Sequence, residues 1–156
     1  MESKLSLSEF RTRLKNNTEI GSTTAHTEKV RIFPISGTIK PFYGSFDNTS
    51  FRLTVNSPKS STPFIVKGNY KDVNNKVSVD YVIEANNKFQ VIWTRYSPII
   101  LILVINIFFL FFARGLRRAS TIVNLFLLFM AFYSRWNEER KRKKLEQKFI
   151  SIFEIR

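Results

Sequence analysis

Residues 98–133 read PIILILVINIFFLFFARGLRRASTIVNLFLLFMAFY, and this stretch decides the fold. It contains two uncharged apolar runs, 98–113 and 119–133, separated by the basic break RGLRR, in which Gly115 can form a tight turn. Ile, Leu and Phe occupy all sides of both predicted helices and leave no polar face. No other part of the chain is large enough to bury these helices. The pattern therefore predicts a two-helix transmembrane hairpin over 96–136, in preference to a buried helix pair of a soluble protein.

The two apolar runs are short for a bilayer. At 1.5 Å per residue they measure roughly 24 and 22 Å, against a hydrocarbon layer of about 30 Å. Flanking aromatic residues extend them, and a hairpin brings all four to the same membrane face as an interfacial belt. These residues are Trp93, Tyr96, Tyr133 and Trp136.

Asn106 and Asn124 are the strongly polar side chains deep in the two runs. They lie at similar depth on antiparallel helices. We therefore expect their amides to hydrogen-bond across the hairpin or between protomers, holding helices together.

Basic residues gather beside the apolar runs and contribute to a formal net charge of +13. More of them lie on the side of the termini than at the tip, which favours a cytoplasmic location for both termini. A re-entrant hairpin is the alternative. The charge suits anionic lipid headgroups, and adjacency to a membrane segment makes nucleic acid an unlikely partner. The basic residues concerned are Arg114, Arg117, Arg118, Arg140, Lys141, Arg142, Lys143 and Lys144.

Residues 1–95 are predicted to form a soluble β-rich module. Ser6 and Glu9 match a capping box, which predicts a helix over 7–16. The apolar period then changes to two, as in half-buried strands joined by short turns in an antiparallel meander. Gly44 and Gly68 are candidate bulges or points of close approach. The predicted strands are 37–46, 50–56, 64–71 and 76–84, with a final one near 88–94.

Residues 137–156 are predicted to form a basic amphipathic helix with Asn137 as its N-cap. Leu145, Phe149, Ile152 and Phe153 recur at helical spacing, and we expect them to dock on the sheet or to lie in the membrane interface. The fold class expected is thus an α+β membrane protein: a small antiparallel meander with a short N-terminal helix, a transmembrane hairpin and a basic C-terminal helix.

The residues give no support for catalysis. The chain has no cysteine and a single histidine, His26, so a Cys-based or multi-His metal site is excluded. No Gly-rich phosphate loop, G-x-S-x-G or H-E-x-x-H motif is present. We therefore predict no enzyme, no cofactor and no metal.

The order of these parts resembles that of short uncharacterised bacterial membrane proteins with an N-terminal β-rich module and a two-helix membrane hairpin. The resemblance implies this architecture and a bacterial inner membrane location, and it implies no activity. An Arg-Asn-Ser-Phe stretch expected before Pro63 is absent. The residues that carry the resemblance are Leu14, Asn17-Thr18, Phe42-Tyr43-Gly44, Phe51, Pro63 through Gly68, Trp93, Asn137-Glu138-Glu139, Leu145 and Phe149.

Three functions fit these features. The first is a membrane-anchored, non-enzymatic interaction or regulatory module whose β-rich part binds a protein or lipid partner. The second is a small membrane-active or immunity-type protein that acts through its hairpin, by forming a homo-oligomer or by binding another membrane protein. The third, an enzyme on a membrane substrate, lacks a recognisable nucleophile and base.

Overall fold

The computed structural model describes residues 1–21, 40–56, 62–74, 76–112 and 117–156. These residues form two compact units. Unit 1 comprises Met1–Asn86 together with Lys141–Arg156, and unit 2 comprises Asn87–Arg140. His26, Arg114 and Gly115 lie outside the described residues.

Unit 1 is built on a six-stranded mixed sheet with the order β1-β6-β5-β4-β3-β2. The antiparallel meander predicted from the sequence is its centre, because β3, β4, β5 and β6 pair in that order. The strands are β1 (Glu2–Ser3), β2 (Thr18–Ile20), β3 (Phe42–Phe46), β4 (Ser50–Val55), β5 (Phe64–Val73) and β6 (Lys76–Ala85).

The two outer strands correct the prediction of a purely antiparallel sheet. β2 pairs in parallel with β3, and the short β1 pairs antiparallel with β6. Both segments are too short to show an alternating apolar pattern, so periodicity does not predict them. Their pairing depends on partners far along the chain.

Helix α1 (Leu7–Asn17) begins where its capping box predicts. The Ser6 hydroxyl accepts from the Glu9 N–H at 3.4 Å, and the Glu9 carboxylate accepts from the Ser6 N–H at 2.9 Å. These bonds satisfy donors that a helix start leaves unpaired. Phe10 and Leu14, one helical turn apart, are fully buried.

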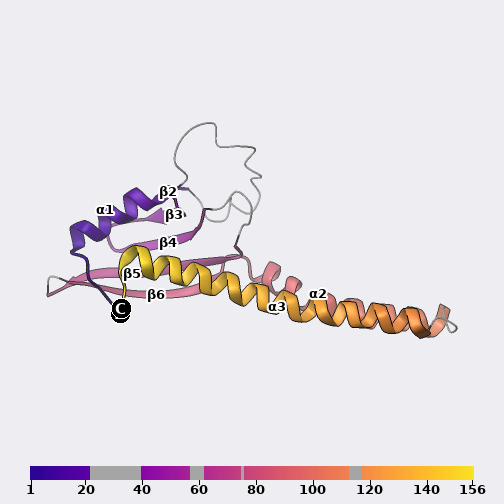
Figure 1. Cartoon of the computed structure of the whole chain (residues 1–156). Helices are drawn as coiled ribbons and strands as arrows, with labels where there is room; N and C mark the ends of the chain where they lie inside the picture. Colours follow the sequence, from indigo (N-terminus) through magenta and orange to yellow (C-terminus); the bar gives the residue numbers. More distant parts are fainter. Residues whose placement is uncertain (22–39, 57–61, 75, 113–116) are drawn as a thin grey trace. The chain divides into compact units, whose positions relative to one another are not determined.

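The core of unit 1 lies between the sheet and two helical segments, α1 and the C-terminal end of helix α3 (Figure 1). The Phe149 ring is 5.2 Å from that of Phe51, and Phe153 is 5.0 Å from Phe10. Phe10 in turn lies 5.0 Å from Tyr70. The C-terminal apolar stripe thus docks on the sheet, the first of the two positions expected for it.

The two ends of the chain close this core together. Glu2 and Arg156 exchange backbone hydrogen bonds of 3.1 and 2.8 Å, and the Ser3 hydroxyl donates to the Phe153 carbonyl at 2.6 Å. Arg13 of α1 forms an ion pair of 2.7 Å with Glu154. The last residues of the chain are therefore a structural part of the β-rich unit.

Unit 2 contains helix α2 (Lys88–Phe112) and the first part of α3 (Arg117–Phe153). The prediction of a strand near 88–94 is wrong, because helix α2 begins at Lys88. The Asn87 side chain accepts from the Gln90 N–H at 3.2 Å, which caps this helix start. Asn is favoured both in turns and at helix N-caps, so the residue type alone does not distinguish the two.

Asn137 is not an N-cap, because α3 continues through it without interruption. No Gly or Pro follows that would end the helix, and the N-cap preference of Asn has little effect inside a helix that tertiary contacts stabilise. The predicted separate C-terminal helix is therefore the second part of α3, which contributes to both units.

The two helices of unit 2 run antiparallel, as their contacts show. Residues near the start of α2 meet residues far along α3: the Ser134 hydroxyl donates to the Thr94 carbonyl at 2.9 Å, and Arg95 lies 3.4 Å from the buried Glu138. Pro98 lies four residues after Thr94 and has no N–H for that carbonyl. Ser134 supplies the missing donor.

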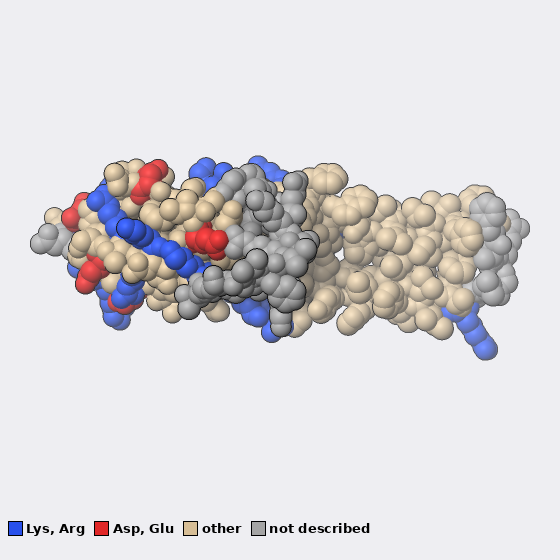
Figure 2. Space-filling model, turned by 90° about the horizontal axis from the view of Figure 1, so that it is seen from above, with Lys and Arg blue, Asp and Glu red and all other residues tan. Residues whose placement is uncertain are grey.

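Within the described residues, one helical segment, Lys88–Phe111, is long and apolar enough by length and composition to cross a membrane, and none of its apolar window is buried. The predicted pair of transmembrane helices is thus not supported on this criterion. The reason is the short apolar run of α3, which charged residues bound on both sides. In the view of Figure 2, charged side chains gather over unit 1, whereas most of the visible face of the helix pair lacks them.

We expect Gly68→Ala to destabilise unit 1 by about 1–3 kcal/mol, the usual cost of overpacking. A Cβ at Gly68 would lie 2.8 Å from the Phe51 ring and would overlap the Asp80 carbonyl oxygen. Chemical unfolding of the full chain in detergent measures the change, with Ser78→Ala on β6 as the control. Equal stability of both variants would contradict the close packing of Phe51 over Gly68.

We expect Ser134→Ala to lower the stability of the helix pair by about 0.5–1.5 kcal/mol, because the Thr94 carbonyl loses its donor. The same change should cost little in a Pro98→Ala background, where residue 98 regains an N–H. A double-mutant cycle on thermal unfolding, followed by circular dichroism in detergent, measures this coupling. Additive effects would show that Ser134 does not replace the bond that Pro98 removes.

Candidate functional site

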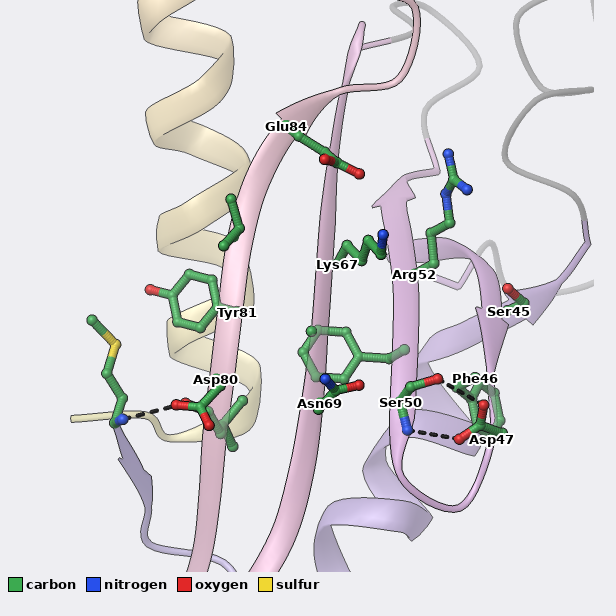
Figure 3. Close-up of a pocket in the computed structure, with 15 residues that line it drawn as sticks. Ser45, Phe46, Asp47, Ser50, Arg52, Lys67, Asn69, Asp80, Tyr81 and Glu84 are labelled. Carbon is green, nitrogen blue, oxygen red and sulfur yellow. Dashed lines mark hydrogen bonds between the residues drawn. The ribbon is translucent and has the colours of Figure 1, made fainter.

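A cavity of about 1030 Å³ lies in unit 1, over the middle strands of the sheet (Figure 3). Successive residues of a strand point to opposite faces of the sheet. Along β4, Leu53 is buried and does not line the cavity, whereas its neighbour Arg52 does. The lining residues are Met1, Ser45, Phe46, Asp47, Ser50, Phe51, Arg52, Lys67, Gly68, Asn69, Val79, Asp80, Tyr81, Val82 and Glu84.

The sheet register arranges these side chains in rows across the strands. Arg52 of β4 is directly opposite Lys67 of β5, and their other neighbours in the row are Ser45 and Val82. This row, which we call the cationic row, therefore holds two adjacent positive charges and no acid. Like charges directly opposite each other destabilise a sheet.

A second row crosses the same strands two residues away. Ser50 is opposite Asn69, and Asn69 is opposite Asp80. On the other side of the cationic row, Glu84 follows Val82 by two residues on β6. Figure 3 shows Arg52, Lys67 and Glu84 toward one end of the cavity and Ser50, Asn69 and Asp80 toward the other. The cations are thus bordered by acids that lie in neighbouring rows.

The protein itself leaves the two cations poorly paired. Arg52 donates from Nη2 to the Asn86 Oδ1 over a long 3.5 Å, and its buried Nε has no hydrogen-bond partner in the part of the chain that the structure describes. Among the same residues, Lys67 forms no hydrogen bond or ion pair. A buried, unpaired donor on a charged group is costly, which makes the cationic row the least satisfied part of the described cavity.

Asp47 has a different role, although it also lines the cavity. Its carboxylate accepts hydrogen bonds from the Ser50 hydroxyl at 2.6 Å, from the Thr49 N–H at 2.8 Å and from the Ser50 N–H at 2.7 Å. The Ser50 hydroxyl bond, followed by the two backbone N–H bonds, lowers the pKa of Asp47 from 3.8 to about 2. Asp47 is therefore the fixed anion of the β3–β4 turn.

Ser50 and Asp47 do not form a nucleophile and general base. A base works best when its pKa lies near the working pH, and a carboxyl group with a pKa of about 2 takes no proton from a serine near neutrality. Tyr81 points its hydroxyl at Glu146 of α3, 3.4 Å away, and burial followed by the Glu146 charge raises its pKa. Within the described residues, no group of three or more metal-ligating side chains occurs.

The aromatic residues expected at a membrane interface lie together at one end of the helix pair. The bond from Ser134 to Thr94 and the ion pair from Arg95 to Glu138 bring residues 93–96 beside residues 133–138. The four side chains are all exposed: Trp93, Tyr96, Tyr133 and Trp136.

Asn106 and Asn124 meet across the helix pair. Each amide donates to the other, at 2.8 and 2.9 Å, and Asn106 also donates to the Ile102 carbonyl at 2.8 Å. Of the two arrangements expected for this pair, across one hairpin or between protomers, the described structure has the first.

The basic residues predicted for headgroup contact or topology lie mainly on α3. Arg114 lies outside the described residues, Arg117 opens α3, and Arg118 is exposed. Arg140 places its guanidinium 5.2 Å from the centre of the Trp136 ring, a cation–π contact. Lys141 is half-buried, whereas Arg142, Lys143 and Lys144 are exposed.

Sequence reasoning missed the cationic row. The alternation over 51–55 placed Arg52 on the polar face of its strand, but many strands carry such residues. The distinguishing fact is that Arg52 stands opposite Lys67, and this depends on register. A shift by one residue would remove the pairing.

Comparison of the chain with protein-family models, with curated proteins and with solved structures gave no match.

We expect the depressed pKa of Asp47 to make unit 1 less stable in acid. A carboxyl group whose pKa is lower in the folded state stabilises it above the unfolded value, near 4, and that contribution disappears as the pH falls through about 2. The stability gap between the wild type and Asp47→Asn should therefore be widest above pH 4 and close toward pH 2. Carboxyl NMR titration checks the midpoint, and Ser50→Ala should raise it; a wild-type midpoint near 3.8 would contradict the turn geometry.

Proposed function

We propose that this chain is a membrane-anchored, non-enzymatic binding module: unit 2 holds it in a lipid bilayer, and the cavity of unit 1 binds a partner at the membrane surface. The observation that carries the proposal is the contrast between the units. Unit 1 has its own buried aromatic core, whereas α2 exposes its apolar residues. Apolar surface of that extent is costly in water and favourable in lipid.

Chain connectivity supports a return across the bilayer. Residues on both sides of unit 2, up to Asn86 and from Lys141, belong to the same compact unit. A folded unit lies on one side of a membrane, so a chain that leaves it through α2 must return to that side. The apolar part of α3 is the segment available for the return, although it is short. We therefore propose that it accompanies α2 as the second helix of a hairpin, with Arg118 near the start of α3 reaching the far headgroups.

The polar groups of unit 2 fit an apolar environment. The Asn106 and Asn124 amides pair with each other, and Ser134 satisfies the carbonyl that Pro98 leaves free. Such internal pairing is what a bilayer requires, because lipid offers no hydrogen-bonding groups. The exposed aromatic residues at one end would lie at the interface, and the basic residues of α3 beside them would face anionic lipids on the cytoplasmic side of a bacterial inner membrane.

The alternative, in which the helix pair itself acts by assembling with other copies, draws less support. The most polar groups in the apolar runs, Asn106 and Asn124, are already paired within one chain. The cavity of unit 1, in contrast, holds the cationic row, in which the buried Nε of Arg52 has no hydrogen-bond partner among the described residues. Replacing 96–136 by an unrelated hairpin separates the two functions, because a binding module keeps its activity after the exchange.

We expect Leu103→Arg to prevent stable membrane insertion, because a charge at the helix centre costs about 2.5–3.5 kcal/mol on insertion scales. Ile20→Arg in β2 is the matched control: its side chain is 76% exposed and that of Leu103 is 61% exposed. For a soluble protein, both changes would be near neutral. The measurement is the fraction of protein that resists alkaline extraction from membranes, and the proposal fails if the two variants behave alike.

Sidedness is measured on the same membranes. Asn48→Cys and Gly115→Cys are probed in intact cells with an impermeant thiol reagent, since the chain has no cysteine of its own. Labelling of Gly115→Cys alone fits the proposed orientation. Labelling of Asn48→Cys alone would place unit 1 outside, and labelling of neither would favour a re-entrant hairpin.

A further inference from the structure

We propose that the cationic row, Arg52 and Lys67, binds the phosphate group of a small phosphate monoester. This inference rests on the proposed binding function and names the chemistry of its ligand. It starts from the register: the two cations are direct cross-strand neighbours in a cavity of about 1030 Å³. Repulsion between the two side chains destabilises the sheet when no anion is bound. An anion between them would attract both.

The donors at this site are not consumed by the protein. Of the Arg52 guanidinium, Nη2 reaches the Asn86 side chain over 3.5 Å, and the buried Nε has no partner among the described residues. Guanidinium is suited to phosphate because it offers several N–H groups in one plane, and lysine adds a mobile second charge. Asp47 lies in the turn between β3 and β4, where its carboxylate accepts hydrogen bonds from Ser50 and Thr49. It therefore does not neutralise Arg52 and Lys67.

Phosphate fits the row better than a carboxylate does. Two adjacent cations match the nearly doubly negative charge of a phosphate monoester at neutral pH, whereas one carboxylate would leave a positive charge uncompensated. Ser45, the next residue in the row, can add a hydroxyl donor. The tetrahedral group has enough oxygens for all three side chains.

The acids around the row restrict the rest of the ligand. Asp80 and Glu84 stand on β6 two residues to either side of Val82, the row's last member. They are thus diagonal cross-strand neighbours of Lys67, and such positions are about 7–8 Å apart. A ligand only a few atoms larger than phosphate would reach them. A polyanion such as nucleic acid would meet both acids, whereas a compact phosphate on a neutral or cationic remainder would avoid repulsion. Asn69 and Asp80 can accept hydrogen bonds from hydroxyl or ammonium groups on that remainder.

The phosphate can come from a soluble ester or from a lipid headgroup, and the test separates the two. The full chain is prepared in maltoside micelles without phosphate. Glycerol 3-phosphate is titrated by calorimetry at constant ionic strength, and phosphatidic acid is added to the micelles in parallel. Binding of either probe supports the site and identifies the source. Binding of neither overturns the proposal.

Arg52→Gln and Lys67→Gln should each weaken binding of the active probe about tenfold or more, the effect of losing one charge-assisted contact. The matched control is Lys71→Gln, an exposed lysine on the same strand that does not line the cavity. An equal loss in Lys71→Gln would show a general charge effect and overturn the assignment to the cationic row.

A folding readout keeps the variants interpretable. Lys67 is exposed and forms no bond in the described chain, so Lys67→Gln should unfold at the wild-type temperature or above it when no phosphate is present, because the like-charge pair is gone. A lower unfolding temperature for this variant would count against the repulsion on which the site depends. Alkaline extraction of Leu103→Arg tests the anchor separately and does not depend on phosphate.

Discussion

The contact of Phe149 with the sheet is the interaction on which the rest of the structure depends. Its ring meets Phe51 of β4 and Tyr81 of β6 at 5.2 and 5.1 Å, and it is fully buried. The sheet is made by residues that precede unit 2, and Phe149 follows it. Because the last turns of α3 complete the core of unit 1, the chain must return to unit 1 after the helix pair. That return makes unit 2 an insertion between parts of one folded unit.

This closure assigns the two faces of the sheet different tasks. On one face, α1 and the end of α3 cover a continuous aromatic core, in which Phe10 and Phe153 touch. The cavity is lined mostly by polar and charged residues of the middle strands. Burial on one face fixes the register, since a slip by one residue would bring polar side chains into the core. The same register places Arg52 opposite Lys67, so the packing of one face determines the chemistry of the other.

The helix pair follows a separate logic. Within it, the Asn106 and Asn124 side chains pair with each other, and the Ser134 hydroxyl pairs with the Thr94 carbonyl. Apolar surface is left outward. Burial of apolar side chains within the protein therefore stabilises unit 1, whereas the apolar side chains of α2 remain exposed.

Features that depend on short-range pattern can be predicted from the amino-acid sequence. The capping box at Ser6 set the start of α1, the alternation over 51–55 and 76–84 marked strands, and the apolar runs marked the helix pair. Two Asn side chains were matched correctly because two antiparallel helices leave few alternatives for their register. In each case, the interactions that favour the structure join residues that are close in the sequence.

Tertiary structure alone decided the features that depend on distant partners. Asn137 had the residue type of an N-cap, yet α3 passes through it, because contacts on both sides outweigh one capping preference. The short strands β1 and β2 exist through pairing with β6 and β3, which their own residues do not encode. The candidate site belongs to this class as well. A lone Arg52 or Lys67 is an ordinary polar residue of a strand, and only the cross-strand register, set by burial of the opposite face, makes them neighbours.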